Sequence, residues 1–173
     1  NTDGTTTYEW TNNNTAIGLA ANGVGDIPSF VVVGSSVVSE IAIIEVTPTY
    51  DFNGVTCTGN PETFTITVNP GAQVDPVAGQ VLCVGESTDE ILFTTSNTDG
   101  LTTYEWTNNN TAIGLAASGI GDIPSFTATN DTASALVATI EVIPTYENGG
   151  VTCTGNPETF TITVNPGAQV DPV

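Results

Sequence analysis

Carboxylates are the only side chains charged at neutral pH in this sequence, which has 173 residues, 19 Asp and Glu, and no Lys, Arg or His. A formal net charge of −19 with no cation excludes proteins that bind nucleic acid through phosphate neutralisation. It also excludes P-loop, Ser-His-Asp and histidine-zinc sites, lysine isopeptide crosslinks and attraction to an anionic membrane. What remains is a binding or structural protein, or an enzyme that uses carboxylates, hydroxyls and a bound metal.

Calcium is the metal that such side chains favour, because it takes oxygen ligands. The candidate ligands lie in the loop GESTDE and in two glycine-rich turns: Glu86, Asp89, Glu90, Asp99 and Asp122. No DxDxDG-type spacing occurs, so a solvated acidic loop is the alternative and no definite metal site is predicted. No pair of carboxylates is expected to share a cleft as in glycoside hydrolases, so we predict no enzymatic activity and no required cofactor.

A repeat organises the whole chain. Residues 1–77 align without a gap on residues 97–173, with 58 identical positions, at a constant offset of 96 residues. This period is the size of an independently folding β-sandwich module. We expect three parts: residues 1–70, a repeat truncated at its N-terminal edge; residues 71–166, a complete repeat; and residues 167–173, the start of another. The truncated repeat should lack an edge strand, which a neighbouring chain segment could supply.

The three cysteines follow the repeat. Cys57 and Cys153 are equivalent, whereas Cys83 lies in the segment 78–96, which occurs once. One complete repeat thus has two cysteines, and we predict a Cys83–Cys153 disulfide that leaves Cys57 unpaired by truncation. Such a bond would indicate an oxidising, extracellular setting. Two free thiols are the alternative.

Alternation with a period of two predicts β-strands within each repeat. It places Phe160, Ile162 and Val164 on one face of residues 159–164, and Tyr104 and Trp106 on one face of residues 103–107. Further strands are predicted at residues 80–84, 91–95, 125–129 and 136–143. Glycine, proline and asparagine turns separate them, so the expected fold class is all-β, with tandem antiparallel sandwich modules. Tyr104, Trp106 and their equivalents Tyr8 and Trp10 are expected to be core aromatics; an aromatic platform for a sugar is the alternative.

Several longer motifs resemble a known family. They are YEWTN at 104–108, IGLAASG at 113–119, PTY at 144–146, GVTCTG at 150–155 and FTITVNP at 160–166. They are similar to the PKD-like, immunoglobulin-like tandem repeats of giant cell-surface adhesins of Bacteroidetes, of which the SprB-type gliding adhesins of flavobacteria are the nearest in kind. The resemblance implies type IX secretion, a bacterial cell-surface location, and a role in an adhesin stalk or filament that serves adhesion or gliding motility.

The expected partners are adjacent repeats of the same chain, with surface polysaccharide or other fibre subunits as further candidates. Nucleic acid and direct membrane insertion are not expected. The alternative functions are a polysaccharide- or partner-binding module and a spacer in a secreted hydrolase. The tripeptide Asp131-Thr132-Ala133 resembles a Bacteroidetes O-glycosylation signal, which makes Thr132 a candidate acceptor; a simple turn is the alternative.

Overall fold

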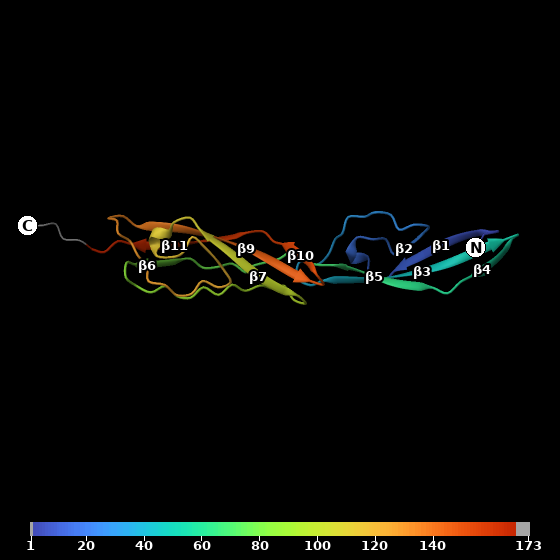
Figure 1. Cartoon of the computed structure of the whole chain (residues 1–173), viewed down its shortest axis with the longest axis horizontal. Coiled ribbons are helices and arrows are strands. Elements are labelled where there is room, and N and C mark those ends of the chain that lie inside the picture. The colour runs from blue at the N-terminus through green and yellow to red at the C-terminus, as the bar shows by residue number, and fades with distance from the viewer. Residues whose placement is uncertain (1, 169–173) are drawn as a thin grey trace, which may run out of the picture. The chain divides into compact units, whose positions relative to one another are not determined.

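The computed structural model describes residues 2–168 and divides the chain into two compact units, Asn1–Pro70 (unit 1) and Gly71–Val173 (unit 2) (Figure 1). The expected all-β class is confirmed: the only helical elements in the described residues are two 3-10 turns of three residues each. No helix among residues 2–168 has the length and apolar character needed to cross a membrane. Most of the range 167–173, which we expected to start another repeat, lies outside the described residues.

Unit 1 is built on one five-stranded antiparallel sheet. Its elements are β1 (Thr5–Asn12), η1 (Thr15–Ile17), β2 (Asn22–Val24), β3 (Glu40–Phe52), β4 (Val55–Thr58) and β5 (Glu62–Val68). The strand order is β2-β1-β3-β4, and β5 also pairs with β3. The long strand β3 has room for both partners, because β5 pairs with residues 40–46 and β4 with residues 49–52.

Unit 2 repeats this sheet and adds one strand. Its elements are β6 (Gln80–Cys83), β7 (Leu101–Asn108), η2 (Thr111–Ile113), β8 (Ser118–Ile120), β9 (Leu136–Asn148), β10 (Val151–Thr154) and β11 (Glu158–Asn165). The order is β6-β11-β9-β7-β8, with β10 also on β9. The added strand β6 runs parallel to β11, so the expectation of a wholly antiparallel arrangement is wrong at this edge.

The two sheets share one register. Trp10 lies opposite Val46 and Trp106 lies opposite Val142, which are positions 96 residues apart. The turn after the first long strand is also the same in both units. In unit 2 the Asn108 amide donates to the Leu115 carbonyl at 3.1 Å, and the equivalent bond of Asn12 in unit 1 is 3.0 Å. Identical local sequences therefore build the same β1–η1–β2 and β7–η2–β8 geometry.

Two predicted strands of unit 2 do not form continuous ladders. Residues 91–95 and 125–129 are extended segments, and the bridges that involve them are isolated ones: Ile91 pairs with Ile123, and Thr127 pairs with Ser87. Pro124 lacks an N–H and interrupts the ladder between the two bridges. Side chains replace part of the ladder: the Ser125 hydroxyl donates to the Thr88 carbonyl at 2.6 Å.

These extended segments form the second layer of unit 2. They cover the inner face of the sheet, where Phe160, Ile162 and Val164 are buried together with Tyr104 and Trp106. The outward residues of the same strands, such as Glu105 and Thr161, are exposed. The alternation read from the sequence thus separates the buried face from the solvent face.

Candidate functional site

The five candidate calcium ligands are spread over several loops and turns and do not gather in one cluster of the described residues. No group of three or more His, Cys, Asp or Glu side chains within residues 2–168 is close enough to hold a metal ion. Asp89 and Glu90 line an open hollow of about 340 Å³ together with Asp75, and Asp99 lies in a turn with a positive φ of 68°.

The other two candidate ligands form hydrogen bonds to the backbone. The Cys83 N–H donates to the Glu86 carboxylate at 2.7 Å, and the Phe93 N–H donates to Asp122 at 2.8 Å. A carboxylate that accepts an N–H fixes the local chain direction. Glu86 and Asp122 therefore hold the segment around residues 83–93 in place.

The predicted disulfide between Cys83 and Cys153 is wrong, because both thiols are free. Cys83 ends β6, next to the part of β11 that pairs with Leu136, whereas Cys153 on β10 lies opposite Tyr146. Ten residues of β9 separate these positions, which is about 33 Å along an extended strand. A disulfide needs Cα atoms within about 7 Å. The disulfide prediction was based on the presence of two cysteines in one complete repeat, but the topology places the two thiols at opposite ends of the sheet.

Thr132 lies in an exposed turn. Its hydroxyl is 2.8 Å from both the Asn130 side-chain oxygen and the Ser134 carbonyl. Asn130 is itself buried and donates to the Val164 carbonyl at 2.8 Å. The hydroxyl is thus part of a local turn that is anchored to the end of β11.

The two tryptophans are core residues, with Trp10 3% and Trp106 5% exposed. Neither indole presents its face to solvent, as stacking on a sugar would require. Gly119 lies directly against the Trp106 ring, and a Cβ at this position would overlap the ring. Gly23 has the same relation to Trp10.

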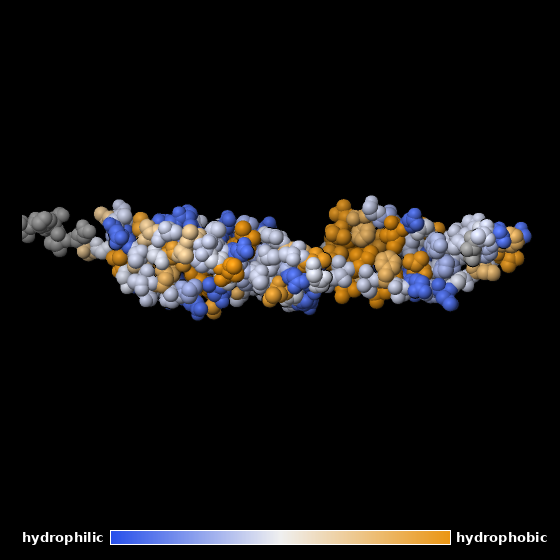
Figure 2. All heavy atoms as spheres, in the orientation of Figure 1, coloured by the Kyte–Doolittle hydropathy of each residue, from blue (hydrophilic) through white to orange (hydrophobic). Residues whose placement is uncertain are grey.

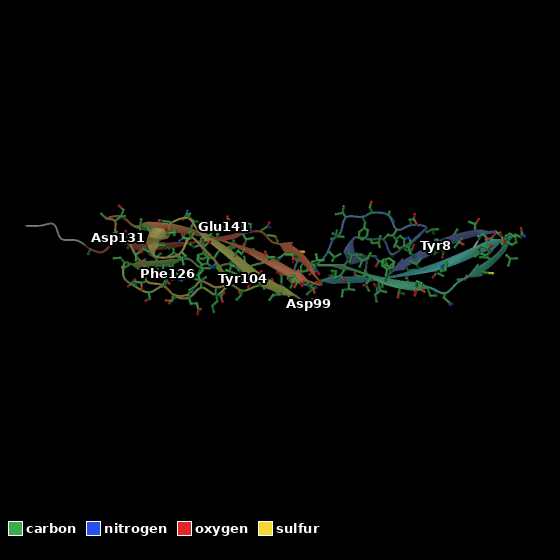
Figure 3. The ribbon with its side chains drawn as sticks, in the orientation of Figure 1. Tyr8, Asp99, Tyr104, Phe126, Asp131 and Glu141 are labelled. Carbon is green, nitrogen blue, oxygen red and sulfur yellow. The ribbon has the colours of Figure 1, made fainter. Side chains whose placement is uncertain are left out.

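Tyr8 is far more exposed than its equivalent in unit 2, Tyr104. Tyr104 on β7 is 8% exposed, whereas Tyr8, at the corresponding place on β1, is 47% exposed (Figure 3). The prediction that Tyr8 is a core aromatic is therefore wrong. The reason is Phe93, whose ring centroid lies 5.4 Å from that of Tyr104 and which has no counterpart in unit 1. Burial raises the pKa of the Tyr104 hydroxyl, with Asp75 as the next cause.

Phe64 shows the same difference. Phe160 on β11 is 5% exposed and lies 6.4 Å from Phe93 between ring centroids, whereas Phe64 on β5 is 45% exposed. Val32, the equivalent of the fully buried Ala128, is 59% exposed. Ile66 and Val68 are only partly buried, although Ile162 and Val164 are fully buried. We call this set, Tyr8, Val32, Phe64, Ile66 and Val68, the open face of unit 1.

Figure 2 shows a broad hydrophobic area on unit 1, over the part where Figure 1 draws the η1 turn and the chain that follows β2. In unit 2 residues 71–96, which we call the covering segment, pack over the equivalents of the open face. Thr127 and Thr129, the equivalents of the exposed Val31 and Val33, stay exposed. Residues 2–70 contain no copy of the part 78–96 of the covering segment. An apolar surface of this kind on a soluble protein is typical of an interaction site.

The covering segment also fills the far end of unit 2. There Tyr146 is fully buried, its hydroxyl donates to the Thr98 carbonyl at 2.8 Å, and the Ala72 carbonyl lies against Gly155. The same place in unit 1 is a hollow of about 250 Å³, lined by Thr6, Pro48, Tyr50, Cys57, Thr58 and Gly59. Unit 1 is therefore uncovered at two places that the covering segment fills in unit 2: the open face and this hollow.

A strand edge completes the candidate site. In unit 2, β11 pairs with β9 on one side and with β6 on the other. In unit 1, β5 pairs with β3, and no strand within residues 2–70 pairs with its other edge. The sequence Ile66–Asn69 on this edge is identical to Ile162–Asn165, which accepts β6 in unit 2. The missing segment in the repeat alignment was the signal that predicted this open edge.

Comparison of the chain with protein-family models and with curated proteins finds no match.

Proposed function

We propose that this chain is a structural repeat of an extracellular bacterial adhesin stalk or fibre, built from tandem immunoglobulin-like modules. The observation that carries the proposal is the identical strand register of the two units at the 96-residue offset. Tandem repeats of one sheet make a protein longer without requiring a new kind of fold or contact. The surface location and the adhesin role come from the resemblance of the motifs to Bacteroidetes surface proteins, because the free thiols no longer argue for an oxidising compartment.

The topology of unit 2 suits a module that bears load. The strand nearest its N-terminus, β6, lies parallel to β11, the strand nearest its C-terminus. A pull on the two chain ends would move these parallel neighbours in opposite directions along their axes. The hydrogen bonds of the four-residue ladder, from Gln80–Ile162 to Cys83–Asn165, would then be loaded together in shear rather than opened one after another.

The strands within residues 2–70 do not show this arrangement. Its first and last strands, β1 and β5, each pair with β3 and not with each other. We therefore expect unit 1 to resist a pull less than unit 2 does. Single-molecule force spectroscopy on the full chain with terminal handles tests this point. Two unfolding events are expected, and the event at higher force should release residues 80–165, from the start of β6 to the end of β11, about 300 Å of extended chain. A single weak event for both units would contradict a load-bearing role.

The surface location needs its own experiment. Antibodies raised against this chain should label intact cells of the organism that produces it, without permeabilisation. Labelling that appears only after permeabilisation would contradict an extracellular stalk. The polysaccharide-binding alternative has less support, since both tryptophans are buried.

A further inference from the structure

We propose that Asn53, in the turn between β3 and β4, is a site of spontaneous covalent modification. The backbone nitrogen of Gly54 attacks the side-chain carbonyl carbon of Asn53 and closes an imide ring. The Gly54 nitrogen gives up its proton, and the side-chain amide takes up a proton and leaves as ammonia. Water then opens the ring at either carbonyl, which leaves an aspartate or an isoaspartate. The reaction needs only water, and the inference does not depend on the adhesin role.

The sequence contains three Asn-Gly steps, at residues 22–23, 53–54 and 148–149. Glycine favours this reaction, because it has no Cβ to keep the asparagine side chain away from the attacking nitrogen and its backbone turns freely. The nitrogen must still rotate towards the side chain, which a hydrogen-bonded ladder opposes. The structure around each step therefore determines its reactivity.

The Asn53-Gly54 step forms the tip of the β3–β4 hairpin. Asn53 has a φ of 54° and Gly54 a φ of 77°, as the two central residues of a type I′ turn require. Both residues are exposed, and Val55 after them is 64% exposed. Within residues 2–168 no hydrogen bond holds the Asn53 side chain or the Gly54 N–H. Such a tip opens locally at a small cost in free energy.

The step at Asn22 is held by a ladder. Gly23 lies opposite Trp10 in the β1–β2 pairing, and the Trp10 ring packs against it. The pairs two residues away on either side are hydrogen-bonded, at 2.7 and 2.8 Å. Hydrogen-bonded pairs alternate along an antiparallel ladder, so the Gly23 N–H donates to the Trp10 carbonyl. The attacking nitrogen is therefore engaged.

The step at Asn148 lies beside the equivalent hairpin tip of unit 2, but one residue earlier. The tip itself is Gly149-Gly150, with φ of 62° and 78°, and Asn148 is a strand residue opposite Val151. The Gly150 N–H donates to the Glu147 carboxylate at 2.9 Å, which fixes the turn. Asn148 therefore has a firmer backbone than Asn53 has.

The tip in unit 1 does not have this bond. Asp51, the equivalent of Glu147, accepts from the Thr56 hydroxyl at 3.1 Å instead. The covering segment has no part in the exposure of the tip, because Gly149 and Gly150 are exposed in unit 2, where that segment is in place. Access to Asn53 is thus a property of the hairpin itself.

The product should loosen the hairpin tip. Aspartate adds a negative charge close to Asp51. Isoaspartate also lengthens the backbone by one methylene group, which the two-residue loop between Phe52 and Val55 does not have room for. In a chain that has reacted, the Val55 amide should exchange with solvent faster than in a fresh chain.

The test incubates the full chain in neutral buffer and maps deamidation by mass spectrometry after chymotrypsin digestion, since the chain has no Lys or Arg for trypsin. Asn53 should react about tenfold faster than Asn22 and Asn148, a ratio that corresponds to about 1.4 kcal/mol in the cost of opening the backbone. In urea the three rates should converge. The double variant Glu147→Asp with Gly149→Asn gives unit 2 the acidic residue and the Asn-Gly tip of unit 1, and it should add a fast site there.

Three results would overturn the proposal. The first is a rate at Asn53 in the folded chain that is no higher than the rates at Asn22 and Asn148. The second is the same ratio of rates in urea, which would show that the local sequence selects the site and the turn does not. The third is a double variant that folds but gains no fast site in unit 2.

Discussion

Phe64 and Phe160 occupy equivalent positions in identical local sequences, PETFTITVNP, yet only Phe160 is buried. Replacement of a buried Phe by Ala costs about 3–5 kcal/mol, because apolar burial is lost and a cavity remains. Phe160→Ala should therefore lower the free energy of unfolding of unit 2 by that amount. Phe64 keeps only about half of its burial and lies on an open surface where no closed cavity would form. Phe64→Ala should lower the stability of unit 1 by about 1–2 kcal/mol.

Native-state hydrogen exchange by NMR can measure both costs in the full chain, because it follows the amides of each unit individually. The reporters are Ile44 and Ile140, which are fully buried at equivalent places on β3 and β9. A tenfold loss of protection corresponds to about 1.4 kcal/mol. If Phe160→Ala unfolds unit 2, the Leu variants at both positions give the same comparison on a smaller scale. Equal costs at the two positions would refute the reasoning, since they would mean that Phe64 is covered in solution.

Three further predictions follow from the contacts in unit 2. The folded-state pKa of Tyr104 is raised, so the unfolded chain loses this proton first and the free energy of unfolding should fall as the pH rises above about 10. In an alkaline denaturation series, Tyr104→Phe should reduce the slope of this free energy against pH. An unchanged slope would count against the burial of the hydroxyl. Gly119→Ala should lower the melting temperature of unit 2, because its Cβ would overlap the Trp106 ring; calorimetry that finds no change would contradict the close packing. Nonreducing mass spectrometry of the folded chain after alkylation should find Cys83 and Cys153 both modified, and a peptide pair crosslinked through these residues would contradict the topology.

The sequence was sufficient to predict the elements whose pattern is local. The alternation at 159–164 and 103–107 determines which side chains of β11 and β7 are buried, and the offset of 96 residues implies that both units repeat these strands. The open edge of unit 1 was also predictable, because the alignment leaves residues 78–96 without a counterpart.

Features that depend on long-range topology could not be derived in this way. The parallel pairing of β6 with β11 separates Cys83 from Cys153 by most of the length of β9, and no local pattern encodes that distance. The exposure of Tyr8 depends on the absence of Phe93, which lies in another part of the repeat. The carboxylates of Glu86 and Asp122 look like metal ligands in sequence, but in the fold each accepts a backbone N–H.

The central claim is that residues 71–96 cover in unit 2 the face that lies open in unit 1. Hydroxyl-radical footprinting tests it most directly, because Tyr8 and Tyr104 have the same chemistry and nearly the same sequence neighbours but are 47% and 8% exposed. The account predicts that Tyr8 is oxidised several-fold faster than Tyr104 in the folded chain. Equal oxidation rates for the two tyrosines would contradict it.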